Sequence, residues 1–130
     1  MNILRIPVRT GETVVDIEVM AALRRKVGTA AFDEFFEDAL CDVTERLSGI
    51  DRAMRTQDLK TAADMARALA AVTNRLGLRS ISTLASALQT QCERGNMIAA
   101  AAIAGRLSHM GERCVMAAAE TSVDLGAIAT

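Results

Sequence analysis

The sequence predicts an all-α fold, an antiparallel up-down bundle of four long helices preceded by an additional short N-terminal helix. The 130 residues are 51% hydrophobic but only 2% aromatic, and a core built from alanine, leucine and methionine favours helix over strand. Apolar residues recur at steps of three and four through most of the chain. The single proline, Pro7, stands near the start and interrupts no later helix. Short turns between long helices favour the up-down arrangement.

The first two elements are a leader and the short helix. Residues 1–12 are expected to form an N-terminal arm, either a short strand or a segment laid over the bundle. Asp16 is a candidate N-cap for a helix over 17–27, and Gly28 ends it. We expect one helical domain over 13–120.

The second helix is predicted from about 30 to 54, with Gly49 inside it. Its apolar stripe is Phe32, Phe36, Ala39, Val43, Leu47, Ile50 and Met54. The third helix is predicted over 59–76, capped by Asp58 and ended by Gly77. Its expected core stripe is Met65, Leu69, Val72 and Leu76.

The last two helices are separated by the turn Gly95-Asn96. The fourth is predicted over about 80–94, and the fifth over about 97–120. The expected inward residues are Ile81, Leu84, Leu88 and Cys92 on the fourth helix, and Ile103, Leu107, Met110 and Cys114 on the fifth. Residues 121–130 are weakly patterned and are expected to form a fraying C-terminal tail.

The third helix carries the most informative segment, Ala66-Arg67-Ala68-Leu69-Ala70-Ala71, with Gly77 six residues further on. It resembles the signature helix of the histidine phosphotransfer (HPt) domain family, whose pattern is Ala-His-x-Leu-Lys-Gly with a later glycine. Arg67 stands where that family has its phospho-accepting histidine, and Ala70 and Ala71 replace the lysine and the first glycine. The resemblance covers about residues 14–116 and implies the HPt helical bundle.

Arginine cannot take over the chemistry of that histidine. Neutral imidazole offers a nitrogen lone pair near pH 7, whereas a guanidinium has five donors, no acceptor and a pKa above about 12. Arg67 can bind a phosphate or a carboxylate, but it cannot carry a phosphoryl group. We therefore expect a degenerate family member with no catalytic residue of its own.

At 100° per residue, Arg67 points away from the expected core stripe of its helix. Small residues surround it on this outer face, together with Asp64 at the flank and a second cation, Lys60. In the HPt family this face docks the receiver domain of a response regulator. The partner-binding residues predicted here are Lys60, Ala63, Asp64, Arg67, Ala70, Ala71 and Asn74.

Composition, charge and the length of apolar runs limit the partners, the location and the cofactors that the sequence allows. The formal net charge is −1 and no basic stripe stands out, so nucleic acid is not an expected partner. No apolar run reaches the ~18 residues of a membrane span and no signal peptide is apparent, so we expect a cytoplasmic protein off the membrane. Cys41, Cys92 and Cys114 are widely spaced and are expected to be reduced, core-filling thiols. With one histidine, no metal site is expected; nor is a cofactor.

These patterns favour a non-enzymatic binding module of two-component signalling that contacts a receiver domain or a histidine kinase. Phosphate loops, nucleophile elbows and zinc-protease motifs are missing from the sequence. Two alternatives stay open. One is an active phosphotransfer protein that uses His109, which is expected to be exposed on the last helix. The other is a helical module that forms a homodimer through the outer face of the third helix.

Overall fold

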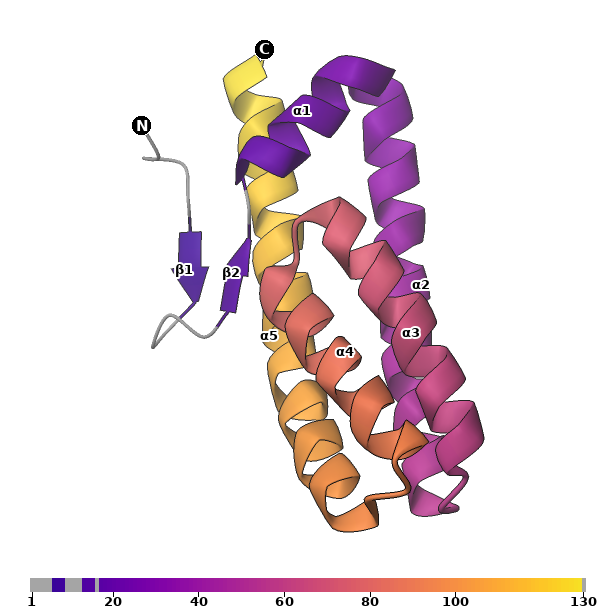
Figure 1. Ribbon diagram of the computed structural model, residues 1–130. Helices are drawn as coiled ribbons and strands as arrows, with labels where there is room; N and C mark the ends of the chain where they lie inside the picture. The colour runs from indigo at the N-terminus through magenta and orange to yellow at the C-terminus, as the bar shows by residue number, and fades with distance from the viewer. Residues whose placement is uncertain (1–5, 9–12, 16, 130) are drawn as a thin grey trace.

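The computed structural model describes residues 6–8, 13–15 and 17–129 of the chain, and it confirms the all-α bundle (Figure 1). The short helix α1 spans Ile17–Val27. The four long helices are α2 (Thr29–Arg55), α3 (Leu59–Leu76), α4 (Arg79–Glu93) and α5 (Met97–Ala129). The long helices pack around a square in the order α2, α3, α4, α5, so α3 and α5 occupy opposite corners.

At both ends of the chain, secondary structure crosses the domain bounds expected from the sequence. The expected tail, 121–130, is not a separate element, because α5 continues to Ala129. No proline stands in that stretch to stop the helix, and alanine favours its continuation. The expected boundary between arm and domain at residues 12 and 13 falls inside a β-hairpin. Strand β1 (Ile6–Val8) pairs antiparallel with β2 (Thr13–Val15), and the hairpin packs beside α4 and α5 (Figure 1). Asp16 lies outside the described residues.

The expected turns are confirmed at both ends of α3 and at the start of α5. Gly77 adopts the left-handed conformation, with φ of 79°, and its N–H donates to the Asn74 carbonyl at 3.3 Å. Glycine is favoured there because a Cβ penalises positive φ. Before α5, the Asn96 side-chain oxygen accepts a hydrogen bond of 3.1 Å from the Ala99 backbone N–H.

Asp58 caps α3 twice, since its carboxylate accepts from the Thr61 backbone N–H at 3.1 Å and from the Thr61 hydroxyl at 2.7 Å. The hydroxyl and then the backbone hydrogen bond lower the pKa of Asp58 below its usual value. The carboxylate therefore stabilises the fold above its ordinary pKa, and this contribution is lost as the pH falls through the lowered folded-state value.

We expect Asp58→Ala to lower the melting temperature at neutral pH, because α3 loses its N-cap. The difference in melting temperature between the variant and the wild type should disappear as the pH falls through the folded-state pKa of Asp58. Thermal melts followed by circular dichroism from neutral to acidic pH check both parts. Asp58→Asn is the matched control, because asparagine caps as well without the charge. Equal melting temperatures for wild type and Asp58→Ala at neutral pH would contradict this role.

The core lies along the centre of the square, and each long helix contributes to it. Fully or almost fully buried side chains include Phe32, Val43, Leu69, Ile81, Leu88, Leu107 and Cys114. Near the start of α2, the rings of Phe32 and Phe36 stack with their centroids 5.2 Å apart. Cys92 and Cys114 fill the core as expected, but Cys41 is exposed on the outside of α2, so that part of the cysteine prediction is wrong.

Two glycines receive large side chains from neighbouring helices. A Cβ at Gly49 would collide with the terminal methyl group of Met65 from α3. A Cβ at Gly111 in α5 would lie 2.7 Å from Cδ1 of Leu47 in α2. Helix α2 therefore contributes the glycine to one of these contacts and the large side chain to the other. Gly49 makes room for Met65 and does not end α2, which continues to Arg55.

Candidate functional site

The outer face of α3 presents a small charged cluster around Arg67. Arg67 Nη2 lies 3.5 Å from Asp64 Oδ1, and Lys60 Nζ lies 3.2 Å from Asp64 Oδ2. All three side chains are exposed, that of Arg67 by 67%. Surface pairs of this kind contribute about 0–1 kcal/mol each, so Arg67 can exchange its contact with Asp64 for another carboxylate at little cost.

The predicted residues Ala63, Ala70 and Ala71 do not all lie around Arg67 on the outer face of α3. Ala71 and Asn74 are exposed, but Ala63 is buried at 6% exposure and Ala70 is half-buried. The expectation that Ala63 lies on the outer face is therefore wrong. The Ser82 hydroxyl of α4 donates to the Ala70 carbonyl at 3.3 Å, which places α4 directly against this side of α3.

The buried face of α3 is rotated toward α4 relative to the face predicted from the sequence. Leu69 and Leu76 are buried as expected, whereas Met65 and Val72 are only half-buried. The other buried positions of α3 are Ala62, Ala63, Ala66 and Thr73. Small side chains allow α3 and α4 to approach closely, and the Thr73 hydroxyl donates within its own helix to the Leu69 carbonyl at 2.7 Å.

The exposed charge of α3 is positive although the chain as a whole is slightly acidic. Lys60, Arg67 and Arg75 are its cations, and Asp64 is its one acidic residue. Arg75 lies about two turns beyond Arg67, nearer to α2. This face therefore suits an acidic partner surface.

An apolar groove that sequence reasoning missed adjoins this face at the end nearest α1. It has a volume of about 470 Å³ and is lined by Val19, Ala22, Leu23, Lys26, Phe35 and Arg75. A second hollow of about 240 Å³ between α2 and α3 shares Phe35 and Arg75 with it. Phe35 is 47% exposed and does not lie on the buried stripe of Phe32 and Phe36. A large aromatic residue off that stripe was the signal in the sequence that could have revealed this groove.

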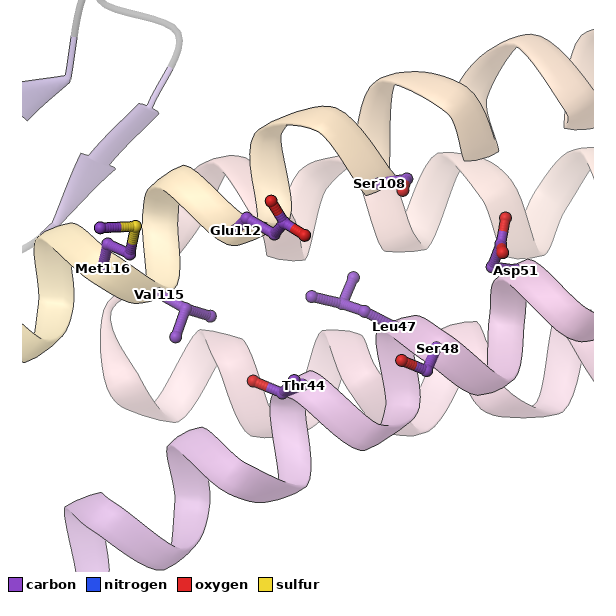
Figure 2. A pocket seen from close by; sticks show the side chains of 8 residues that line it. All are labelled: Thr44, Leu47, Ser48, Asp51, Ser108, Glu112, Val115 and Met116. Atoms are coloured by element: carbon purple, nitrogen blue, oxygen red, sulfur yellow. The ribbon is translucent and has the colours of Figure 1, made fainter.

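Another groove, of about 400 Å³, lies between α2 and α5 (Figure 2). Leu47 projects between the two helices, with Thr44, Ser48 and Asp51 beside it on α2 (Figure 2). The α5 side is lined by Ser108, Glu112, Val115 and Met116. This groove was not predicted either, and it lies away from the outer face of α3.

Neither His109 nor the thiols of Cys92 and Cys114 lie on the outer face of α3. His109 is exposed on α5, as expected, at the corner of the bundle opposite α3. Burial raises the pKa of the Cys114 thiol to about 11, so this thiol is protonated near neutral pH and is a poor nucleophile. Between residues 18 and 120, no group of three or more His, Cys, Asp or Glu side chains is arranged to hold a metal ion.

No protein-family model matches the sequence, and no curated protein matches it. Among solved structures, the fold is similar to the crystal structure of histidine-containing phosphotransfer protein B from Pseudomonas aeruginosa. The TM-score is 0.77 at 16% sequence identity, over 85% of this chain and 95% of that one. The chain therefore has the fold of a histidine-containing phosphotransfer protein. No helix in the described residues has both the length and the apolar character needed to cross a membrane.

Proposed function

We propose that this chain is a pseudo-HPt module of two-component phosphorelay signalling, which docks a response-regulator receiver domain or a histidine kinase without carrying phosphate itself. The observation that carries the proposal is an HPt fold in which Arg67, the residue that the sequence resemblance sets at the position of the family's histidine, is exposed on α3. The docking residues are Lys60, Asp64, Arg67, Ala70, Ala71 and Asn74, with Ala63 acting beneath them by letting α4 pack closely.

The chemistry of Arg67 supports occupation of a receiver rather than transfer. A receiver domain, as the family partnership implies, holds its phosphorylatable aspartate in an acidic pocket. A guanidinium pairs with carboxylates through two parallel N–H···O bonds, so Arg67 fits such a pocket as a pseudo-substrate. Because it has no lone pair to attack phosphorus, it occupies the receiver without unloading it.

The surroundings of Arg67 support the remainder of the contact. Ala71, next to it on the outer face, leaves room for a partner helix, and Lys60 adds a weaker attraction at the rim. Arg75 leads from this face to the apolar groove beside Phe35, where a partner can bury hydrophobic surface. Arginine and aromatic side chains are both enriched at protein interfaces, so Arg67, Arg75 and Phe35 together suit a docking surface.

We expect the protein to take up no phosphoryl group from a phosphorylated receiver domain of the same organism. Arg67 is not a nucleophile, and His109 stands alone on α5. Incubation with radiolabelled receiver-phosphate, followed by a search for acid-labile label on this chain, measures the transfer. A histidine-containing phosphotransfer protein that accepts phosphate from the same receiver is the positive control.

The His109→Gln variant separates the alternatives in this assay. Label on the wild type that disappears in His109→Gln would overturn the proposal and establish transfer through His109. Absence of label together with measurable receiver binding supports the pseudo-HPt role. If neither receivers nor kinases bind and the chain self-associates through α3, the dimerisation alternative is the better description.

A further inference from the structure

The groove where α1, α2 and α3 meet has the size and lining of a small-molecule site. Its lining residues are Val19, Ala22, Leu23 and Lys26 from α1, Phe35 from α2 and Arg75 from α3. Small-molecule sites occur between the helices of bundles, measure about 300–1,000 Å³ and are mostly apolar with a few polar groups. This groove has a volume of about 470 Å³, with four apolar residues and two charged ones.

The apolar part of the groove is left open to solvent by the bundle itself. Phe35 is 47% exposed, although Phe32 and Phe36 of the same helix are buried. Val19 and Leu23 are only half-buried on the wall that α1 forms. An apolar body placed in the groove would remove surface of both walls from water, and this favours binding.

The polar part of the groove consists of two cations, Lys26 and Arg75. Within the part of the chain that the structure describes, neither of them has an ion-pair partner. The other two cations of α3, Lys60 and Arg67, both pair with Asp64. The aliphatic stem of Lys26 can lie along the groove while its ammonium group stays in water. The rim therefore suits an anionic head group.

Two acidic residues share a hollow with Arg75 but do not pair with it. Asp38 and Asp42 line the smaller hollow between α2 and α3, and Asp42 is paired with Arg46 at 2.9 Å. Neither carboxylate lines the groove beside Phe35. The lining of that groove therefore carries two positive charges and no negative one.

We propose that this groove binds a small amphipathic anion, an aliphatic carboxylate of medium chain length. Its apolar chain would lie between Leu23 and Phe35, and its carboxylate between Lys26 and Arg75. The apolar lining selects the chain, and the two cations select the sign of the head group, since a guanidinium can hold a carboxylate by two parallel hydrogen bonds. The groove adjoins the docking face, but the binding is measured on this chain alone and does not rest on the proposed function.

A titration of the isotope-labelled full chain with sodium decanoate, followed by nuclear magnetic resonance, tests the site. Decanoate has about 12 non-hydrogen atoms and the groove is partly open, so we expect a dissociation constant on the order of 0.1–1 mM. The amide signals of Leu23, Phe35 and Arg75 should shift with one common constant. Ile98 is the internal control, because it is 85% exposed and lies in the first turn of α5, at the end of the bundle away from α1 (Figure 1).

Two results of this titration would overturn the proposal. One is the absence of shifts in the groove at several millimolar decanoate. The other is a shift of Ile98 as large as that of Phe35, which would mean that decanoate coats any exposed apolar side chain.

Charge variants test the assignment of an anion. Lys26→Glu and Arg75→Glu should each raise the dissociation constant for decanoate about fivefold or more, because an attraction becomes a repulsion. Arg25→Glu is the matched control, since Arg25 is exposed on α1 and does not line the groove. It should change the constant by about twofold at most. Equal effects of the three variants would contradict a head-group site at Lys26 and Arg75.

A probe of opposite charge completes the test. Decyltrimethylammonium has a chain of the same length as decanoate and a cationic head group. It should bind the groove at least about fivefold more weakly, since both rim charges repel it. Equal affinity for the two probes would show that the groove does not select an anion and would overturn the proposal.

Discussion

Leu69→Ala is expected to lower the free energy of unfolding by ~2–5 kcal/mol, because the truncation leaves a cavity where α3 meets the centre of the bundle. Leu69 is fully buried, and it is the residue of the signature segment that fixes which side of α3 faces inward. Its loss should therefore destabilise the fold without altering the charge of the docking face. Urea denaturation at equilibrium, analysed as a two-state transition, measures the change.

Asn74→Ala is the matched control on the same helix, since Asn74 is exposed and is expected to change stability by about 0.5 kcal/mol at most. The comparison separates core packing from general effects on α3. A cost for Leu69→Ala no larger than that of Asn74→Ala would contradict the central position of this leucine.

The second large effect is expected from Arg67→Glu, which should weaken receiver binding by ~2–5 kcal/mol, or about 30-fold and more. The substitution turns a cation into a carboxylate that faces an acidic pocket, and it also places that carboxylate beside Asp64. Isothermal titration calorimetry against receiver domains from the same organism measures the affinity. Stability should change little, because Arg67 does not face the core.

Two variants test the specificity of this effect. Arg106→Glu makes the same charge change at an exposed position of α5 and should leave receiver binding unchanged. Ala71→Arg adds positive charge but obstructs close approach, so it should weaken binding although electrostatics alone would strengthen it. If a receiver binds and neither Arg67→Glu nor Ala71→Arg alters its affinity, the docking face lies elsewhere.

The positions of the helices could be predicted from the sequence because the signals that mark helix ends are local. Asp58, Gly77 and the Gly95-Asn96 turn mark helix ends through contacts within a few residues, and the structure places the ends of α3 at the expected residues. The extension of α5 was not accessible in the same way. Residues 121–129 contain no proline and only a weak apolar pattern, which does not distinguish a helix from a tail.

The orientation of α3 and the grooves depend on neighbouring helices, which a sequence pattern describes poorly. Met65 and Val72 dominated the apolar pattern by size, while the buried Ala62, Ala66 and Thr73 contributed little to it. The exposure of Arg67 and Lys60 was predictable because both lie far from either version of the stripe. The groove beside Phe35 was not, because its lining comes from three helices.

The paired contacts Met65–Gly49 and Leu47–Gly111 have a mechanical consequence. Parallel cylinders can slide along one another, but a side chain seated over a glycine acts as a key that blocks such translation. Helix α2 is keyed to α3 at one position and to α5 at another. Lengthwise sliding of α3 or α5 along α2 therefore requires Met65 or Leu47 to leave the space above its glycine, which couples the positions of α3 and α5 through α2.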